Sequence, residues 1–508
     1  MRFEITTPTQ LSVSIQQTLR PVLPVIKGCK EYRDQETLIL KIDRLLKVSG
    51  IEELFLKLSL EEDEARALAS GKQRDEWQRE RFAQHSIRAL RCVILRHLLG
   101  GSLREMSNRL AECQLFQMFC RLTDFERAHI PNRSVLQRYE HWLPQEKMAQ
   151  ILEQLTQVLS DETKAHEVGL KHTIKMEMVT VDTTCLEANI HFPADWVLLR
   201  DAVRTLMKAT ATIRNHGLKK RMLEPSNFIS RINSHCMAMS GARRKKDSKK
   251  QRKATLRAMK TLVDVVKNHA LRHRDYLDQA WEQTDLSRAQ ADVILARIDS
   301  ILKQLPEAKR QAHERIIGER QVPSQEKILS LYESDLHVIT RGKAGAEVEF
   351  GNTLFIATQE QGYIFDHQLL QETSPGDPQL LLKHFCRIEK ASQGHVASIS
   401  ADRGFDSAAT RRLLEEKDVF NALCPRSPVE LAKRLKEEPA FKKLLKKRSQ
   451  VESRISILKH VFLWSTPKAK GYEHRAMQVT WAVLAHNLWI VARRSRWKED
   501  EELAALAA

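Results

Sequence analysis

Three acidic residues stand in sequence settings that suit a divalent metal ion. Asp182 follows the alternating run Met-Val-Thr-Val, Asp402 follows Ser-Ile-Ser-Ala, and Glu452 lies in the helical segment 449–454. The alternation of β-branched and apolar residues predicts strands, so we expect both aspartates at strand ends. Carboxylates that hold two Mg²⁺ ions can activate an oxygen nucleophile and neutralise phosphate oxygens. This is the chemistry of phosphodiester cleavage.

Each of these acids also has an ordinary structural explanation. Aspartate often caps a turn, Asp402-Arg-Gly is a common turn sequence, and a helical glutamate usually faces water. The helix around Glu452 is more informative, because Leu445, Arg448, Glu452 and Lys459 follow one another at intervals of three, four and seven residues. These intervals place the four side chains close to one helix face, with Lys459 roughly 10 Å along the axis from Glu452. A metal ligand between two cations could grip successive phosphates.

The composition favours a polyanionic partner. The 508 residues include 83 Lys and Arg against 65 Asp and Glu, which gives a formal charge of +18. Nucleic acid fits this balance, although a basic surface can also serve only to keep a protein dispersed. Eight scattered cysteines form no Cys-x-x-Cys pair, and the longest apolar stretch, 479–492, is short for a membrane span. We therefore expect a protein of a reducing, intracellular setting with no membrane segment.

The helical and strand patterns divide the chain into segments. Strand texture occurs before Asp182 and returns only after residue 333, so one sheet is expected to be split by a helical insertion too long for a loop. The later strands are predicted at His337–Thr340, Val348–Thr358, Gly362–His367, Val396–Ala401 and Val419–Leu423. The predicted segments are an all-α amino-terminal DNA-binding region (1–170), the first strand of an α/β catalytic domain (171–195), the helical insertion (196–332), the rest of that domain (333–495) and a frayed tail (496–508).

Two further segments could contact DNA. Short helices that begin near Gly101 and Pro131 follow one another as in a helix-turn-helix, or as in a plain helical bundle. The basic run 243–253 inside the insertion could follow a phosphate backbone or form a solvated turn.

Four short sequence blocks occur in a characteristic order and spacing. They are Asp182-Thr-Thr-Cys-Leu-Glu187, Arg341-Gly-Lys343 with Val348-Glu-Phe-Gly351, Ala401-Asp402-Arg-Gly-Phe-Asp406, and Val451-Glu452-Ser-Arg454 through Lys459. Together they resemble the first-aspartate, second-strand, second-aspartate and glutamate blocks of DDE-type bacterial insertion-sequence transposases. The resemblance covers about two thirds of the chain. The family's glutamate block often carries a tyrosine where this chain has Leu445, and a leucine cannot make the hydrogen bond of a tyrosine hydroxyl.

The resemblance implies a ribonuclease H-like catalytic domain, a mixed sheet flanked by helices. It further implies metal-dependent strand cleavage at the inverted ends of a mobile element and transfer of the cut strand into double-stranded target DNA. Asp182, Asp402 and Glu452 would be catalytic and would hold two Mg²⁺ ions, or Mn²⁺ in their place. The expected DNA contacts are Arg448, Arg454, Lys459, Arg403 and Lys343, and a homodimer is expected in the working complex.

Two alternative functions remain open from the sequence. One is a catalytically inactive DNA-binding protein derived from such an element, and the other is a related metal-dependent nuclease that cuts without joining. Four polar residues near the blocks have structural interpretations instead. Glu187 and Asp195 are expected to cap the following helix, Asp406 to be the N-cap of the helix that contains Arg411, and His486 to be a core residue.

Overall fold

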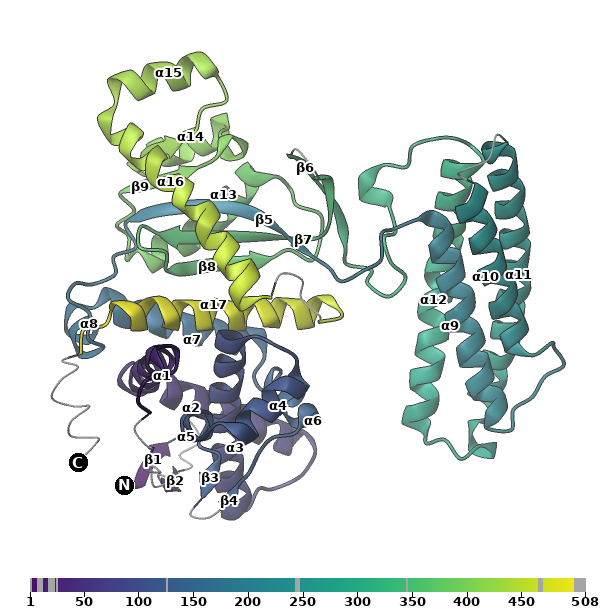
Figure 1. The fold of residues 1–508 in the computed structure, drawn as a ribbon, viewed down its shortest axis with the longest axis horizontal. Helices are drawn as coiled ribbons and strands as arrows, with labels where there is room; N and C mark the ends of the chain where they lie inside the picture. Colours follow the sequence, from purple (N-terminus) through teal and green to yellow (C-terminus); the bar gives the residue numbers. More distant parts are fainter. Residues whose placement is uncertain are drawn as a thin grey trace. The chain divides into compact units, whose positions relative to one another are not determined.

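The fold is that of a computed structural model, drawn in Figure 1. It describes residues 2–6, 12–16, 23, 26–124, 127–242, 247–343, 346–464 and 469–497, with the side chains of 2–16 and 341–347 not included. Most of the predicted tail and residues 243–246 of the basic run lie outside the described residues. Two compact units are present: unit 1 comprises Met1–Leu186, Thr353–Leu370 and Ser374–Ala508, and unit 2 comprises Glu187–Asn352 and Gln371–Thr373.

The amino-terminal part of unit 1 is mostly helical. It contains α1 (Lys30–Val48), α2 (Ile51–Ala69), α3 (Glu76–Leu99), α4 (Leu103–Glu112), α5 (Gln114–Phe119), α6 (Arg133–Tyr139), α7 (Gln145–Ser160) and α8 (Glu162–Glu167). Two antiparallel hairpins, which the helical periodicity did not predict, also occur: β1 (Arg2–Thr6) with β2 (Ser12–Gln16), and β3 (Thr123–Asp124) with β4 (Arg127–Ala128).

The core of this helical part is built around α17 (Tyr472–Arg494). Every residue from Arg475 to Leu488 is buried, because α1, α3 and α7 pack against this helix from several sides. Charge is buried there too: Arg91 is inaccessible and binds Asp43 and Glu52 at 2.6 and 2.5 Å. The apolar stretch that was too short for a membrane span is therefore a core helix. Within the described ranges, no helix combines the length and the apolar character needed to cross a membrane.

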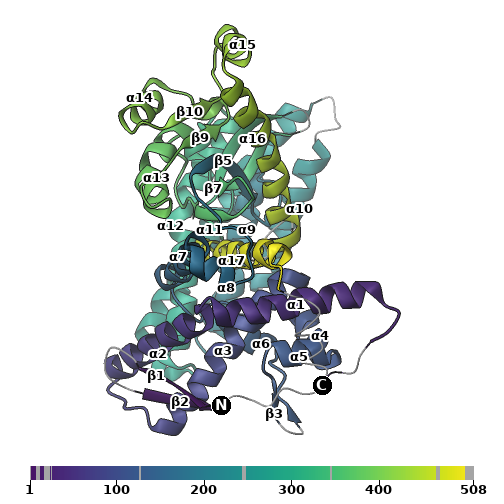
Figure 2. The same cartoon turned by 90° about the vertical axis from the view of Figure 1, so that its left-hand side faces the viewer.

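A mixed sheet forms the second part of unit 1. Its strands are β5 (Met178–Glu187), β7 (Ala346–Gln359), β8 (Ile364–Leu369), β9 (Ser398–Ala401) and β10 (Phe420–Leu423). The order is β10-β9-β5-β7, with β8 on β7; β5, β9 and β10 are parallel, whereas β8 is antiparallel to β7. The flanking helices are α13 (Asp377–Ala391), α14 (Ala408–Glu416), α15 (Pro428–Glu437) and α16 (Pro439–Ile457), with α13 and α16 on either side of the sheet in Figure 2. This arrangement is consistent with a ribonuclease H-like domain.

The first strand is longer than its sequence pattern suggested. We expected Asp182 at its end, but β5 continues to Glu187. The residues Thr183-Thr-Cys-Leu keep the β-type composition, and Thr184, Cys185 and Leu186 are buried. Asp182 therefore lies in the middle of β5, just past its paired register with β9.

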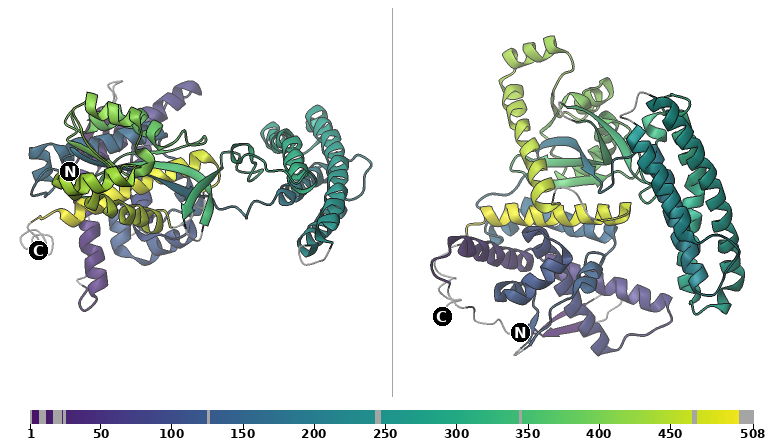
Figure 3. Two further views of the ribbon diagram at one scale, coloured as in Figure 1. Left: turned by 90° about the horizontal axis from the view of Figure 1, so that it is seen from above. Right: turned by 45° about the vertical axis from the view of Figure 1, so that its right-hand side comes forward.

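Unit 2 is dominated by four long helices: α9 (Asp195–Asn215), α10 (Pro225–Ala242), α11 (Ser248–Ala280) and α12 (Arg288–Ile316). Figure 3 shows these helices side by side, and their apolar stripes share one core that includes Leu206, Ile232, Val263 and Ile298. Unit 2 also contains β6 (His337–Lys343), which pairs antiparallel with the first half of β7, with His337 opposite Gly351.

Candidate active site

The two predicted aspartates lie side by side on parallel strands. Thr180 is paired with Ser400 in the register of β5 and β9, and their hydroxyl oxygens are 2.9 Å apart. Side chains alternate along a strand, so Asp182 and Asp402, each two residues further on, project from this same face. Neighbouring strands are about 4.8 Å apart, which makes the two carboxylates close neighbours.

Burial and like charge act together on Asp182. Its pKa is raised from 3.8 to about 6, first by desolvation and then by the negative charge of Asp402. The N–H of Thr183 donates to Asp182 Oδ1 at 2.8 Å and opposes this increase by favouring the ionised form. A carboxylate that repels its neighbour in a partly desolvated site is a good place for a cation.

Asp402 has the turn role that its sequence suggested, in addition to its place beside Asp182. It is the N-cap of the 3₁₀ turn η3 (Arg403–Phe405), and its Oδ1 accepts the N–H of Gly404 at 2.8 Å. This bond fixes one carboxylate oxygen at the end of β9. Since a carboxylate has several lone pairs, capping the turn leaves acceptor capacity for another ligand.

A third carboxylate at this site was missed by the sequence reasoning. Asp377 begins α13, and its Oδ1 accepts the hydroxyl of Thr183 at 2.9 Å. Its charge also contributes to the raised pKa of Asp182. A Cβ atom on Gly404 would collide with Asp377 Oδ2 and lie 3.0 Å from Asp402 Oδ1, so the glycine allows both acids to approach the same backbone. In sequence, Gly376-Asp377-Pro378 reads only as a helix start.

Helix α16 crosses the face of the sheet toward which these acids project. Thr180 and Ser400 share a small cavity with Leu444 and Lys447 of α16. Arg448, one residue further, is close enough to Asp182 to lower the pKa of that carboxyl. Its Nε is buried and has no hydrogen-bond partner among the described residues. The structure thus brings Arg448 to the aspartate pair, as its place on the helical stripe suggested.

Glu452 is placed differently from the two aspartates. It follows Arg448 by one turn of α16, but its side chain is exposed and has no hydrogen bond or ion pair within the described part of the chain. In the same described part, no group of three or more His, Cys, Asp or Glu side chains is arranged to hold a metal ion. The predicted triad is therefore represented here by a pair, with Glu452 on the helix that covers the same face.

Two of the predicted DNA-binding cations are engaged with backbone carbonyls. Arg454 is half-buried and donates to the carbonyl oxygens of Gln359, at 3.0 Å, and Glu360 in the turn after β7. Lys459, in the π-helical turn Leu458–Phe462, donates to the carbonyl oxygen of Cys185 at 2.8 Å. Both contacts tie the α16 region to strands of the sheet. A DNA-binding role for either residue remains a prediction.

Arg403 and Lys343 are the last two predicted DNA contacts. The side chain of Arg403 is exposed after the end of β9. Lys343 ends β6 in unit 2, and its side chain lies outside the described residues.

Of the four residues near the blocks that received structural interpretations, only His486 has the expected role, as a core residue. The caps predicted at Glu187 and Asp195 are wrong, because the N-cap of α9 is Ala194 and no described side chain caps this helix. Asp195 begins α9, is buried, and accepts bonds from Arg315 and Gln311, whereas Glu187 is exposed. His486 is buried against the edge of a phenylalanine ring, and burial lowers its pKa to about 4.

The N-cap predicted at Asp406 is wrong by one residue. Ser407 caps α14 in a reciprocal arrangement with Thr410. Asp406 instead binds the guanidinium of Arg411, with Oδ1 to Nε at 2.6 Å, and accepts the N–H of Arg426 at 3.0 Å. Asp406 pairs with Arg411 because this arginine lies about one helical turn away. The adjacent Ser407 can cap α14 without disturbing that ion pair.

A mixed sheet with acids beside one another at parallel strands is typical of ribonuclease H-like nucleases. Comparison with known proteins indicates which kind of nuclease this fold resembles. Residues 340–488 match the family model described as the transposase DDE domain. The matched segment includes Asp402, Arg448 and Glu452, and its similarity to this domain supports a DDE-type insertion-sequence transposase. No curated protein and no solved structure matches the chain.

Proposed function

We propose that this protein cuts DNA strands at the ends of its own mobile element and joins the freed 3′ ends to target DNA. The observation that supports this most is that Asp182 and Asp402 each follow by two residues the paired Thr180 and Ser400 of the parallel strands β5 and β9, with Asp402 inside the matched transposase domain. The basic charge of +18 suits a partner that carries one phosphate per nucleotide.

The donor set fits a hard divalent cation. Asp182 and Asp402 offer oxygen ligands. The pKa of Asp182 is raised first by burial and then by the charge of Asp402, and a positive ion would offset both effects. We propose that these two residues hold Mg²⁺, or Mn²⁺, with Glu452 as the third ligand of the two-ion site. When bound, the ions would activate the attacking oxygen and neutralise charge on the phosphate.

The chain's own residues would position the DNA strand at this site. Arg448 brings positive charge beside Asp182, where a phosphodiester has to lie during the reaction. Its Nε is free to donate to a phosphate oxygen, since it has no hydrogen-bond partner in the described structure. Asp377 acts through Thr183, whose hydroxyl it binds, and so holds the residue next to Asp182 in place.

The test is a Mg²⁺-dependent cleavage assay on DNA that carries the element's ends, with Asp182→Ala, Asp402→Ala and Glu452→Ala. Each variant should lose strand cleavage and keep its affinity for the ends, because that affinity comes mostly from phosphate contacts elsewhere. Glu437→Ala is a matched control, since Glu437 is also an exposed helical glutamate. Cleavage retained in all three variants would refute the assignment. Binding by the unaltered protein without nicking would indicate an inactive DNA-binding protein, and nicking without joined products would indicate a simple nuclease.

We also propose that a homodimer performs the reaction at the bacterial nucleoid, since two element ends have to be held together. The four-helix bundle of unit 2 is the part of the chain that we propose for this contact. Analytical ultracentrifugation of the protein with DNA ends should detect two protomers per complex of paired ends.

A further inference from the structure

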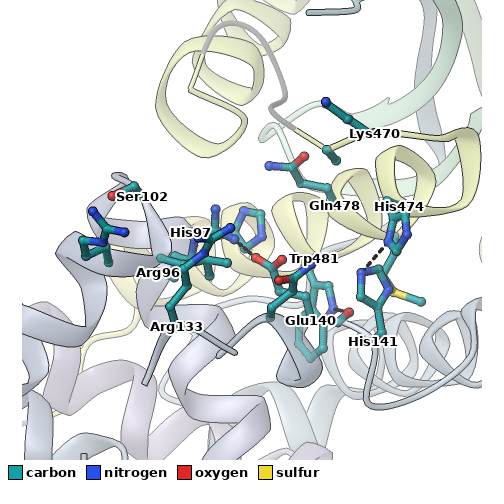
Figure 4. Close-up of a pocket in the computed structure, with 15 residues that line it drawn as sticks. Arg96, His97, Ser102, Arg133, Glu140, His141, Lys470, His474, Gln478 and Trp481 are labelled. Carbon is teal, nitrogen blue, oxygen red and sulfur yellow. Dashed lines mark hydrogen bonds and ion pairs between the residues drawn. The ribbon is translucent and has the colours of Figure 1, made fainter. Parts of the chain in front are cut away.

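A cavity separate from the carboxylate pair lies in the helical part of unit 1. It has a volume of about 610 Å³. Its walls come from the end of α3, the beginning of α4, helix α6, the first half of α17 and residues 469–470. Figure 4 shows Lys470 and Gln478 on one side of this space, and Arg96, Arg133 and Glu140 on the other.

The charges that line the cavity favour an anion. Arg96, Arg104, Arg133 and Lys470 are its Lys and Arg residues, and Glu140 is the single carboxylate among its lining residues. Glu140 is neutralised in an ion pair with Arg96. Arg104, Arg133 and Lys470 are exposed and have no ion pair within the described residues. Three cations that line the cavity are therefore without an ion pair in the part of the chain that the structure describes.

The cavity also contains buried polar atoms that lack a partner. Arg96 and Gln478 are each only 8% exposed. Arg96 Nε and Gln478 Oε1 have no hydrogen bond in the described part of the chain. A buried donor or acceptor without a partner is costly, so the pair marks a place where a ligand with complementary groups would be stabilised.

The size and the remaining walls indicate more than a bare phosphate. A volume of this size is typical of sites for small organic molecules. Trp481, Leu103 and Met477 add aromatic and apolar surface next to the polar groups. A flat ring with hydrogen-bonding edges, attached to a phosphate, matches this combination of walls.

We propose that this cavity binds one unpaired nucleotide of a DNA strand. Its phosphate would lie against Arg104, Arg133 and Lys470, and its base would reach Arg96 and Gln478. The inference rests on the proposed function, because it takes DNA as the source of the nucleotide. A free nucleotide has the same chemistry and is separated from DNA by the experiment.

The experiment measures binding of the full-length chain to a fluorescently labelled single-stranded oligonucleotide by anisotropy, in buffer without divalent metal. Arg104→Ala, Arg133→Ala and Lys470→Ala should each weaken binding about tenfold and reduce its salt dependence by about one ion. Arg138→Ala is the matched control, because Arg138 is exposed on the same short helix as Arg133 but does not line the cavity. It should stay within about twofold of the unaltered protein. Thermal melting verifies that each variant is folded.

A second arm tests the nucleoside. A deoxynucleoside monophosphate should displace the labelled strand at concentrations at which inorganic phosphate does not, and Gln478→Leu should weaken this competition. Equal competition by inorganic phosphate would refute the claim that the cavity recognises the base and sugar of the nucleotide. If Arg104→Ala, Arg133→Ala and Lys470→Ala, here called the rim variants, bind the labelled strand with the same affinity as Arg138→Ala, the proposed DNA site is refuted. This holds even if a free nucleotide still binds.

The outcome is independent of the cleavage test. If the rim variants bind normally while Asp182→Ala abolishes cleavage, the cavity inference fails and the proposed function stands. If the rim variants lose binding while Asp182→Ala, Asp402→Ala and Glu452→Ala all still cleave, the proposed function fails and the cavity inference stands.

Discussion

Replacing Asp182 with asparagine should stabilise the folded protein at neutral pH while it removes a ligand of the proposed metal site. In the folded protein without metal, the pKa of this carboxyl is raised from 3.8 to about 6 by burial and by Asp402. The folded state therefore binds the proton more tightly than the unfolded state does. Folding becomes less favourable as the pH rises from about 4 to about 6, and the full penalty persists above pH 6.

The magnitude follows from the size of the pKa change. The difference between 3.8 and about 6 corresponds to an upper limit of about 3 kcal/mol. Asparagine has nearly the same shape, can still accept the N–H of Thr183, and carries no charge. Because Asp182 is half-buried rather than fully buried, we expect Asp182→Asn to raise the free energy of unfolding by about 1–3 kcal/mol at pH 7.5. The gain should vanish near pH 4.

Urea unfolding with EDTA present measures the change in the free energy of unfolding at pH 7.5 and at pH 4. Asp406→Asn is the control with the opposite sign, because Arg411 holds the pKa of Asp406 below its ordinary value and an amide loses that ion pair. This control should be destabilised at pH 7.5. Added Mg²⁺ should stabilise the unaltered protein more than Asp182→Asn.

Two results would contradict this reasoning. One is an Asp182→Asn protein no more stable than the unaltered protein at pH 7.5. The other is an equal gain at pH 4 and pH 7.5, which would mean that the effect comes from packing and not from charge.

Three further changes test contacts around the site and the core. Gly404→Ala should lower the strand-cleavage rate by about tenfold or more with a small change in melting temperature, because its Cβ would push Asp377 away; an unchanged rate in the cleavage assay would contradict this. Arg454→Ala should lower the free energy of unfolding by about 1–3 kcal/mol in urea titrations, since two backbone carbonyls lose their donor, and equal stability would show that water replaces it. Arg91→Ala should cost about 3–5 kcal/mol or prevent folding, because Asp43 and Glu52 lose the fully buried cation between them and keep only the more exposed Lys47 and Arg121; a melting curve like that of the unaltered protein would refute the role of this ion cluster.

Local chemistry explains the elements that could be predicted from the sequence. The short strands β9 and β10 fall within the expected segments, since each mixes apolar with small or polar residues over a few positions between turn residues. The helices of unit 2 follow the apolar stripes that include Ile298 and Leu305. The end of β5 was misjudged because an acid usually stops a strand, whereas the threonines after Asp182 continue this one.

The pairing of Asp182 with Asp402 was also within reach of the sequence. Each acid follows a strand-forming run, and parallel strands of one sheet place equivalent residues side by side. What the sequence alone determined is therefore the set of short-range features: which residues are strand or helix, which acids follow strands, and which blocks resemble a transposase.

Only the tertiary structure decided which distant groups meet. Asp377 joins the site 194 residues after Thr183, and nothing in its own neighbourhood distinguishes it from a residue that caps a helix. Arg448 of α16 lies beside Asp182, Glu452 of α16 is exposed, and Lys459 in the following π-helical turn binds a backbone carbonyl. The packing of this region on the sheet thus separates side chains that the sequence spacing places on one stripe. Long-range contacts of this kind depend on how elements pack, and this is a property of the whole chain and not of any one segment.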